Sequence, residues 1–462
     1  MTPLGAFFIP ITLACLVWTP AHLLPLLVVA SVFEAGTVMN SSVGNFVFGL
    51  SPFYMVEIAI AFCLLRHLWN GGAWLPPKST PARPIAILLI AFLGWSLFSA
   101  FVMPRLFAGM PIVSPRDRID VDLITGNLTP LQWTFSNLGQ GIYLALNVGA
   151  ALFAFLLVQS KEQARGLAQA LRWALVLVVV AGLLQYALPL IGGSYPYSVF
   201  NNNPNNTLAS TPLDQQIDGF TRISSTFAEP MNSGSFLAAV AGGLLASYLR
   251  GQRGIGALLW LIAVLFVLLQ TTSTTGYVTV VVMLLPLLAY FNPLARPKLP
   301  GQPSFFKGWA AAACTAAAIV AFALLWVPGL LQAFVPMTVD KSEGMSYLSR
   351  VAADQESFAM FTDTYGIGVG LGSSRPASLL MTLLSTVGIV GTALFAMVLY
   401  HIARLFPGRR APSPLQMSFW SLAGLLVASM GVPDINRPAL WALLIMVPAQ
   451  SQVYSGVAGD SV

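Results

Sequence analysis

A polar, charged segment between two apolar runs carries the side chains best suited to chemistry in this sequence. It is GFTRISSTFAEPMNSG, residues 219–234, and its charged members are Arg222 and Glu229. Charges beside a bilayer are costly unless they bind one another or a ligand. An arginine donates two parallel, charge-assisted hydrogen bonds that suit phosphate oxygens, and Glu229 would orient such an anion or act as a base. The other interpretation is an interfacial ion pair that steadies the next helix. Candidate substrate-binding side chains here are Ser224, Ser225, Thr226 and Asn232.

A glycine-rich segment after Arg350 forms the second candidate. Residues 365–375 are YGIGVGLGSSR, with four glycines alternating from Gly366 to Gly372 and Arg375 at the end. This spacing is wrong for a dinucleotide-binding fingerprint. One interpretation is a flexible loop whose backbone packs closely. The other is an extended loop whose backbone approaches a bulky ligand, with Arg350 and Arg375 on either side. The ligand contacts expected in that case are Gly368, Gly370, Gly372 and Ser373.

Smaller features have weaker functional interpretations. Arg105 is a candidate substrate-binding residue, although it precedes a loop of mixed charges, Arg116, Asp117, Arg118, Asp120 and Asp122, which predicts self-neutralisation. The hydroxyl-rich residues 271–276 are expected to form a solvated turn in preference to a ligand contact. Glu57 lies within an apolar run, where an acid is either functional or paired with a structural partner. Neither a His/Cys cluster nor a histidine in a long loop is present, so no metal or other cofactor is predicted.

The elements that must position these residues are apolar helices. Of the 462 residues, 56% are hydrophobic and 8% are charged, whereas soluble domains carry about 25% charged residues. Since a span needs ~20 apolar residues, the sequence predicts an all-α, polytopic bundle of about 12 spans that forms a single transmembrane domain, residues 1–462. The expected spans are 4–33, 52–69, 84–102, 138–158, 173–191, 235–249, 255–270, 277–291, 309–327, 379–402, 415–430 and 439–453. Prolines interrupt residues 4–33, which form either one kinked span or a hairpin.

The N-terminal residues and the cysteines support neither a cleavable signal peptide nor a disulfide framework. No basic residue precedes the first apolar run, so this run is expected to stay as a span. Cys15, Cys63 and Cys314 all lie in apolar runs, which argues against disulfides.

Loop charges orient the bundle. Fourteen basic residues and only two acids lie in one set of alternate loops, against eight basic residues and fourteen acids on the other side. The positive-inside rule then puts both termini in the cytoplasm. The long loops 103–137, 192–232 and 328–378 face outside, and the last two contain the candidate site. Scattered basic residues give no reason to expect a nucleic-acid partner.

The two candidate segments resemble the O-antigen polymerase and O-antigen ligase superfamily of bacterial inner-membrane glycosyltransferases. The resemblance rests on RISSTFAEPMN at 222–232, Arg350, GIGVGLGSSR at 366–375 and GIVG at 388–391. It implies a multi-pass enzyme of the inner membrane that acts on the periplasmic face. Such an enzyme moves a glycan from an undecaprenyl-diphosphate carrier and uses no nucleotide. Arg222, Arg350 and Arg375 would hold the diphosphate and sugars.

The expected function is polymerisation of lipid-diphosphate-linked oligosaccharide repeat units into exopolysaccharide or O-antigen. Ligases of the superfamily carry a histidine before the span after the second loop, where this chain has SRPAS at 374–378. A ligase, or another lipid-carrier glycosyltransferase, is the alternative. A lipid or sugar transporter belongs to a different class and would require charges and broken helices at mid-membrane. The resemblance implies a flippase and a chain-length regulator as partners. If Glu229 is structural, Asp354 or Glu356 would be the base.

Overall fold

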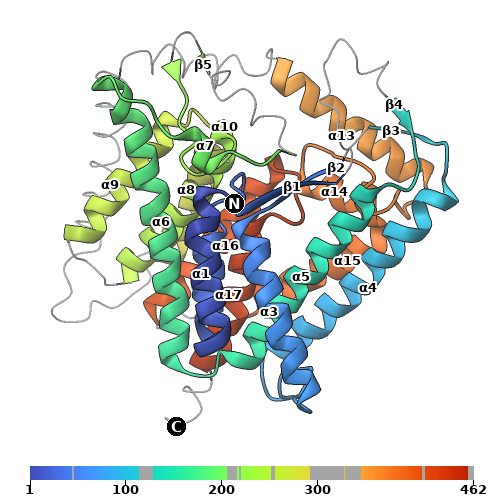
Figure 1. Ribbon diagram of the computed structural model, residues 1–462, viewed down its shortest axis with the longest axis horizontal. Coiled ribbons are helices and arrows are strands. Elements are labelled where there is room, and N and C mark those ends of the chain that lie inside the picture. Colours follow the sequence, from blue (N-terminus) through green and yellow to red (C-terminus); the bar gives the residue numbers. More distant parts are fainter. Residues whose placement is uncertain are drawn as a thin grey trace.

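Helices dominate the computed structural model, which describes residues 1–43, 46–113, 128–204, 216–217, 220–250, 255–291, 327, 345–407 and 411–455 (Figure 1). The helices are α1 (Pro3–Trp18), the 3-10 turn η1 (Pro20–His22), α2 (Leu23–Ala30), α3 (Pro52–Trp69), α4 (Ala82–Leu106), α5 (Phe135–Leu157), α6 (Lys161–Leu190), α7 (Tyr197–Phe200), α8 (Pro230–Arg250), α9 (Ile255–Gln270), α10 (Thr274–Tyr290), α13 (Met345–Asp363), α14 (Leu379–Thr382), the π-helical turn η6 (Leu383–Val387), α15 (Gly388–Ala403), α16 (Ser413–Ala428), the 3-10 turn η7 (Ser429–Gly431) and α17 (Pro438–Ser455). The strands pair as antiparallel hairpins: β1 (Met39–Val43) with β2 (Phe46–Leu50), β3 (Pro111–Val113) with β4 (Leu128–Pro130), and β5 (Gln216–Ile217) with β6 (Phe220–Thr221).

The described helices include five that are long and apolar enough to cross a membrane. They are Pro52–Trp69, Ala82–Leu106, Phe135–Leu157, Lys161–Leu190 and Leu379–Ala403. Pro3–Trp18, Pro20–Ala30, Gly256–Gln270 and Thr274–Tyr290 are shorter apolar helical segments. The expectation of an all-α membrane protein therefore holds, whereas the number of twelve spans is not confirmed. Of the predicted span 309–327, all but residue 327 lies outside the described residues.

Small residues allow the two central helices α8 and α16 to pack closely. A Cβ at Gly243 would lie 2.4 Å from Met417 O, and one at Gly424 would lie 2.8 Å from Ala239 Cα. Close backbone approach at small residues is the usual device of helix association in membranes. The packing leaves α8 almost entirely buried, so the residues at its N-terminus are fixed by the core of the bundle.

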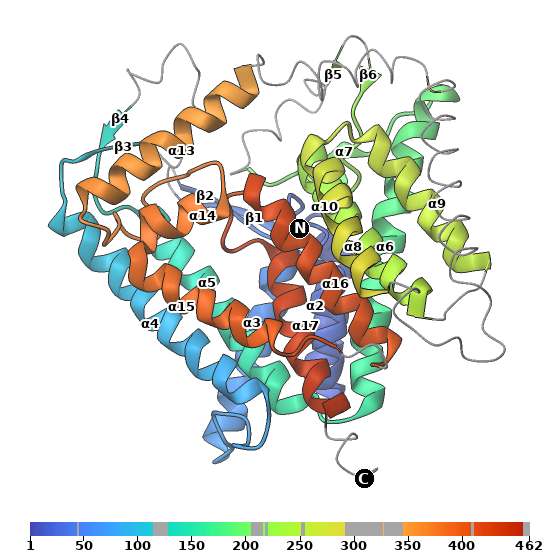
Figure 2. The same ribbon diagram turned by 180° about the vertical axis from the view of Figure 1, so that it is seen from behind.

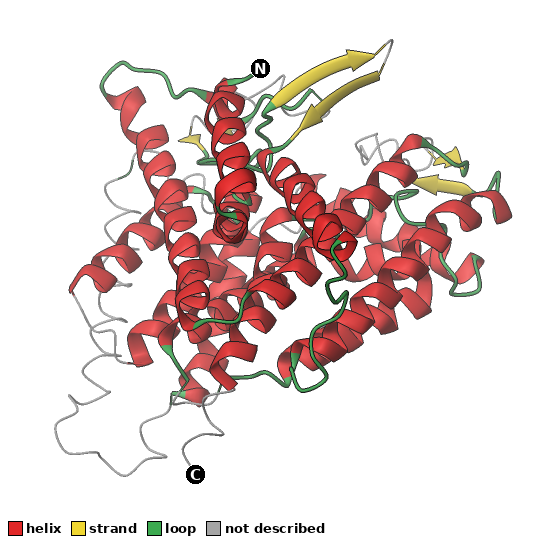
Figure 3. Cartoon of the chain, turned by 60° about the horizontal axis from the view of Figure 1, so that its bottom comes forward, coloured by secondary structure: helices red, strands yellow, loops and turns green. Residues whose placement is uncertain are grey.

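The two ends of the bundle differ in structure. The strand end carries β1–β6, α7 and α13, and the C-terminal end is where α17 finishes (Figures 1 and 2). Figure 3 shows the strands grouped at the strand end, opposite the C-terminus. The predicted long loop 328–378 is not wholly irregular, because it contains α13, on which Arg350 lies.

Residues 4–33 form a hairpin, α1 followed by η1 and α2, which decides between the two alternatives of the sequence. Thr2 N donates to Val38 O at the strand end. At the other end of the chain, Gln452 Nε2 donates to Val158 O beside the start of α6. The first and last described residues therefore lie at opposite ends of the bundle, whereas the charge pattern predicts that both termini face one side. The reason is the additional passage through the bundle that the hairpin makes.

Candidate functional site

Arg222 is anchored to the turn that joins α9 and α10. Its Nε donates to Thr272 Oγ1 across 2.7 Å and to Thr271 O across 3.2 Å. The adjacent backbone follows the same turn, since Ile223 N donates to Gln270 O at 3.1 Å. One edge of the guanidinium is thus fixed by the protein.

The predicted solvated turn is wrong, because the turn is buried. Thr271 and Thr272 are 0% exposed and Ser273 is 2% exposed. A Cβ at Gly234 would lie 2.6 Å from Ser273 Cβ, so α8 packs directly against the turn. Hydroxyl-rich sequence suggested solvent, but here the hydroxyls satisfy buried backbone groups and hold Arg222.

The predicted serine and threonine ligands hold their own segment in place. The backbone N–H groups of Ser224 and Ser225 donate to Gln185 Oε1 at 3.1 and 2.8 Å. Thr226 Oγ1 donates to Val32 O at 2.7 Å. All three residues are buried. Their position favours a role in shaping the segment between Arg222 and Glu229.

The N-terminus of α8 brings together residues from three distant parts of the chain. Asn232 Nδ2 donates to Glu34 Oε1 at 3.2 Å, and Asn232 O accepts from Arg437 Nη2 at 3.1 Å. Arg437 is 0% exposed, and its Nε and Nη1 have no hydrogen-bond partner among the described residues. A buried guanidinium is costly unless charges compensate it, and Glu34 provides one such charge.

Glu34 occupies an electrostatically mixed environment outside the membrane-crossing helices. Burial raises the pKa of its carboxyl to about 7, Arg437 and Arg375 oppose the rise, and Asp434 and Glu229 add to it. The side chain nevertheless remains partly accessible. A carboxyl group with a pKa near neutrality can exchange protons at working pH, as general acid–base chemistry requires.

Asp434 stands in the short loop before α17, and a hydrogen-bond network fixes this loop. Asp434 Oδ1 accepts from Asn436 N at 2.8 Å, and Asn436 Nδ2 donates to Gln140 Oε1 at 2.7 Å. Tyr54 Oη donates to Asn436 O at 2.9 Å. Burial raises the pKa of the Asp434 carboxyl, while the Asn436 N–H, Arg375 and Arg437 lower it. The Asp434 side chain keeps contact with solvent, although the protein atoms around it are numerous enough to raise the pKa of its carboxyl.

Arg350 reaches the same region from α13. Its Nη1 lies 2.9 Å from Met231 Sδ, at the start of α8, and 3.3 Å from Gly431 O. Burial lowers the pKa of the Arg222 guanidinium, Glu229 raises it and Arg350 lowers it again. Arg222, Glu229 and Arg350 are therefore close enough for their charges to interact.

Three of the four residues predicted as catalytic, Arg222, Glu229 and Arg375, are connected through Glu229 and Glu34, and the fourth, Arg350, acts on Arg222. Glu229 acts on both Arg222 and Glu34, and Arg375 acts on Glu34. Arg375 itself is exposed. These couplings indicate one charged region around the N-terminus of α8.

Asp354, a predicted alternative base, supports the loop that carries Arg375. Its Oδ1 accepts from Ala377 N at 2.8 Å and from Ser378 N at 3.2 Å. These two hydrogen bonds hold the backbone of the loop against α13. The geometry therefore favours a positioning role for Asp354. Glu356, the other alternative, is half-buried on α13.

The glycine-rich loop is packed against protein at its three predicted ligand contacts, which favours the closely packed alternative over the prediction that its backbone approaches a bulky ligand. A Cβ at Gly368, Gly370 or Gly372 would lie 2.8 Å from Gly388 N, 2.7 Å from Pro104 Cδ or 2.8 Å from Ser136 O, respectively. All three have φ between +83° and +103°, a conformation that glycine adopts without strain. Ser373 is buried, and its Oγ accepts from Asn137 Nδ2 at 2.7 Å. The closely packed alternative accounts for these residues.

Arg105 takes part in a different set of contacts. Its guanidinium carbon lies 5.4 Å from the Trp133 ring centroid, and its Nη1 donates to Phe101 O. These contacts do not involve Glu229 or the other three predicted catalytic residues. The mixed-charge residues 114–127 next to it lie outside the described residues.

Glu57 has no hydrogen-bond partner among the described residues and is 0% exposed, so the structural partner that the sequence allowed is not found there. The described residues also contain no group of three His, Cys, Asp or Glu side chains that could hold a metal ion. Cys15 and Cys63 are free.

Sequence reasoning missed Glu34, Asp434 and Arg437. Each lies at the end of an apolar run, on the side of the membrane to which the charge pattern assigns the two candidate segments. Their shared side of the membrane was the one sequence feature that linked them to the candidate site. Their contacts with the site could not be predicted, because the residues are far apart along the chain: Glu34 precedes Asn232 by 198 positions.

Comparisons with known proteins identify no family: no protein-family model matches the chain, and no curated protein is similar to it.

Proposed function

We propose that this protein is a membrane glycosyltransferase that joins lipid-diphosphate-linked oligosaccharide repeat units into a polysaccharide. The active site would be the charged region around the N-terminus of α8, on the periplasmic side of a bacterial inner membrane. The undecaprenyl-diphosphate carrier would supply the glycan, and no nucleotide would take part.

One observation carries the proposal: Arg222, Arg350 and Arg375 come from three separate segments and belong to one chain of charge interactions. Arg350 acts on Arg222, Glu229 acts on Arg222 and on Glu34, and Arg375 acts on Glu34. A diphosphate bound in this region would lie near cations from a loop, a helix and a second loop. Arginine suits a diphosphate, because its donors match phosphate oxygens in pairs.

The chemistry assigns each group a task. An acceptor hydroxyl oxygen attacks the anomeric carbon of the donor sugar, and the bond from that carbon to the diphosphate oxygen breaks. The diphosphate leaves with the electron pair, and the arginines stabilise the charge that develops on it. The hydroxyl proton passes to a carboxylate. Glu34, with a pKa of about 7, suits this proton transfer, and Glu229 and Asp434 tune it.

The direct test uses purified full-length protein in proteoliposomes with radiolabelled lipid-linked repeat units. Products with more than one repeat unit, resolved by gel electrophoresis, are the expected result. Transfer of a single glycan to a different lipid acceptor, without chain growth, would replace polymerase by ligase. Uptake of intact lipid-linked units without any new glycosidic bond would identify a transporter. An Arg66→Gln variant, altered on the exposed end of α3, is the control and should retain full chain growth.

A further inference from the structure

A large hollow lies at the C-terminal end of the bundle, away from the site described above. Its volume is about 1810 Å³. It is lined by the segment before α4, the start of α6, the residues after α15, the start of α16 and the end of α17. It is larger than the ~300–1,000 Å³ of typical small-molecule pockets, so its occupant would be larger than a single inorganic ion.

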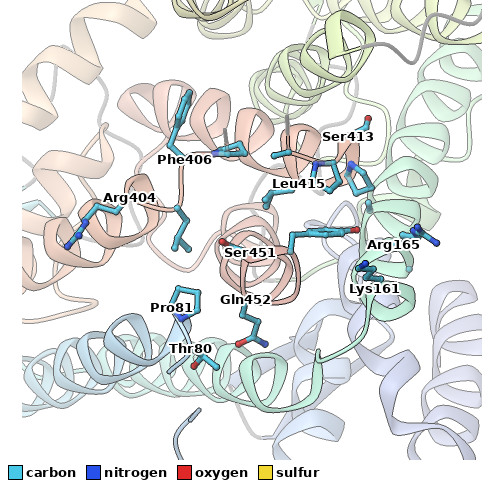
Figure 4. A pocket seen from close by; sticks show the side chains of 18 of the residues that line it. Thr80, Pro81, Lys161, Arg165, Arg404, Phe406, Ser413, Leu415, Ser451 and Gln452 are labelled. Atoms are coloured by element: carbon cyan, nitrogen blue, oxygen red, sulfur yellow. The ribbon is translucent and has the colours of Figure 1, made fainter. Parts of the chain in front are cut away.

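The charges around the hollow have one sign. Its cations are Lys78, Lys161, Arg165, Arg172 and Arg404, and no Asp or Glu is among the described residues that line it. Lys161, Arg165 and Arg172 are spaced four and seven positions apart, which places them on one face of α6. Figure 4 shows Arg404 on one side of the hollow and Lys161 and Arg165 on the other, with Ser451 and Gln452 between them.

Backbone dipoles add to this positive field. The helices α4, α6 and α16 all begin at the hollow, through Pro84, Lys161 and Ser413. A helix N-terminus carries about half a positive charge and favours anions. In the first two turns of α6, Lys161 and Arg165 oppose that dipole and Glu162 complements it. An anion in the hollow would interact favourably with the helix N-termini and with both cations.

The position of the hollow indicates where such an anion would come from. The candidate spans Ala82–Leu106 and Lys161–Leu190 begin at this end, and Leu379–Ala403 ends there. With these helices as spans, the hollow would lie at the depth of the lipid head groups. The positive-inside rule explains cations that flank spans, but it does not require them to surround one hollow that also has apolar walls, such as Phe406 and Leu415.

We propose that this hollow binds the phosphate groups of an anionic phospholipid. The head group would lie between Arg404 and the α6 cations, with its glycerol and acyl carbons against the apolar wall. Because cations line both sides, a lipid with two phosphates should bind more tightly than a lipid with one. This site is independent of the proposed function, since it lies at the other end of the bundle.

The test measures binding of cardiolipin, phosphatidylglycerol and phosphatidylcholine to the detergent-purified protein by native mass spectrometry. We expect the apparent affinity to fall in that order. Each basic residue near a membrane surface contributes about a factor of five to anionic lipid binding. Arg165→Gln should therefore weaken cardiolipin binding about fivefold, and Arg165→Gln with Arg404→Gln about 25-fold. Arg66→Gln, at the same end but outside the hollow, is the matched control and should bind like the wild type.

Two results would overturn the proposal. Equal affinity of the double variant and the Arg66→Gln control would show that lipid binding is not located in the hollow. Binding of inorganic pyrophosphate alone, at the concentration that suffices for cardiolipin, would assign the same cations to a soluble phosphate compound. Chain-growth activity of the double variant is a separate measurement and does not decide either outcome.

Discussion

Asn232 Nδ2 donates a hydrogen bond to the carboxylate of Glu34 across 3.2 Å, although 198 positions separate the two residues. Asn232 lies in the first turn of α8, and Glu34 follows the N-terminal hairpin. The backbone of Asn232 also accepts from the buried Arg437. One residue of the predicted motif thereby connects the segment after α2 with the residue that precedes α17, and both of these contacts lie outside the motif itself.

Substitutions of Arg222 distinguish the contribution of its charge from that of its hydrogen-bonding geometry. Its Nε is bound to Thr272 Oγ1, so Arg222→Lys keeps a charge but loses the anchored fork. We expect Arg222→Ala to reduce the rate of chain growth 10²–10³-fold, about the loss of one transition-state donor. We expect Arg222→Lys to lose nearly as much. Radiolabelled product in proteoliposomes gives the rates.

Thr272 provides the matched control for Arg222. Thr272→Ser retains the hydroxyl acceptor and should stay close to wild type, whereas Thr272→Ala should lower kcat through a misplaced Arg222. Wild-type rates in Arg222→Ala, with normal amounts of folded protein, would remove this residue from the site.

The pKa of Glu34 makes protein stability depend on pH in a defined direction. The pKa is about 7 in the folded protein against an ordinary 4.5, so the folded state binds more protons between these values. The stabilisation from this group is complete below pH 4.5 and is lost as the pH rises through 7. The melting temperature of the wild type should therefore fall relative to Glu34→Gln over this window. An unchanged difference between the two proteins across the window would contradict the assignment.

Ionisation of the Glu34 carboxyl should increase activity, although it decreases stability. A carboxyl group that accepts the proton must be ionised, so the rate of chain growth should rise as the pH passes 7. Glu34→Gln should lose this rise together with most of the rate. Glu162→Gln alters an exposed acid in the first turn of α6 and should keep the wild-type profile. A wild-type pH profile in Glu34→Gln would require another base.

Gly370 tests whether the glycine-rich loop is structural. With φ at +103° and Pro104 Cδ 2.7 Å from an added Cβ, Gly370→Ala should lower the melting temperature and the yield. The left-handed conformation alone costs about 1–2 kcal/mol. Gly94→Ala is the control, since Gly94 lies in α4 with no atom within 4 Å of the added Cβ. Unchanged stability with lost chain growth in Gly370→Ala would restore the ligand-binding interpretation of this loop.

The orientation of the bundle can be tested at described, exposed positions. In a protein whose native cysteines are replaced, Ser194→Cys at the strand end should react with an impermeant thiol reagent applied to spheroplasts. Ser79→Cys, between α3 and α4, should react only after the membrane is opened. Both serines are exposed, so accessibility within the protein does not distinguish them. The reverse labelling would place the candidate site on the cytoplasmic side.

The sequence by itself determined the helical membrane architecture and the segments that carry charge. Both follow from local properties, since apolar runs of span length and the alternation of loop charges need no knowledge of packing. Residues 222–232 could be selected for the same reason, because Arg222 and Glu229 are conspicuous in an apolar chain.

Only the tertiary structure decided which side chains meet. Gly368, Gly370 and Gly372 could have faced a ligand or protein, and the packing of η6, α4 and α5 against their loop places protein beside each of them. Thr271 and Thr272 were predicted to lie in a solvated turn, but in the structure they are buried and anchor Arg222, because α8 covers them. Glu34, Asp434 and Arg437 joined the site through contacts across hundreds of positions. Such contacts depend on how helices pack, and no local pattern of residues encodes that arrangement.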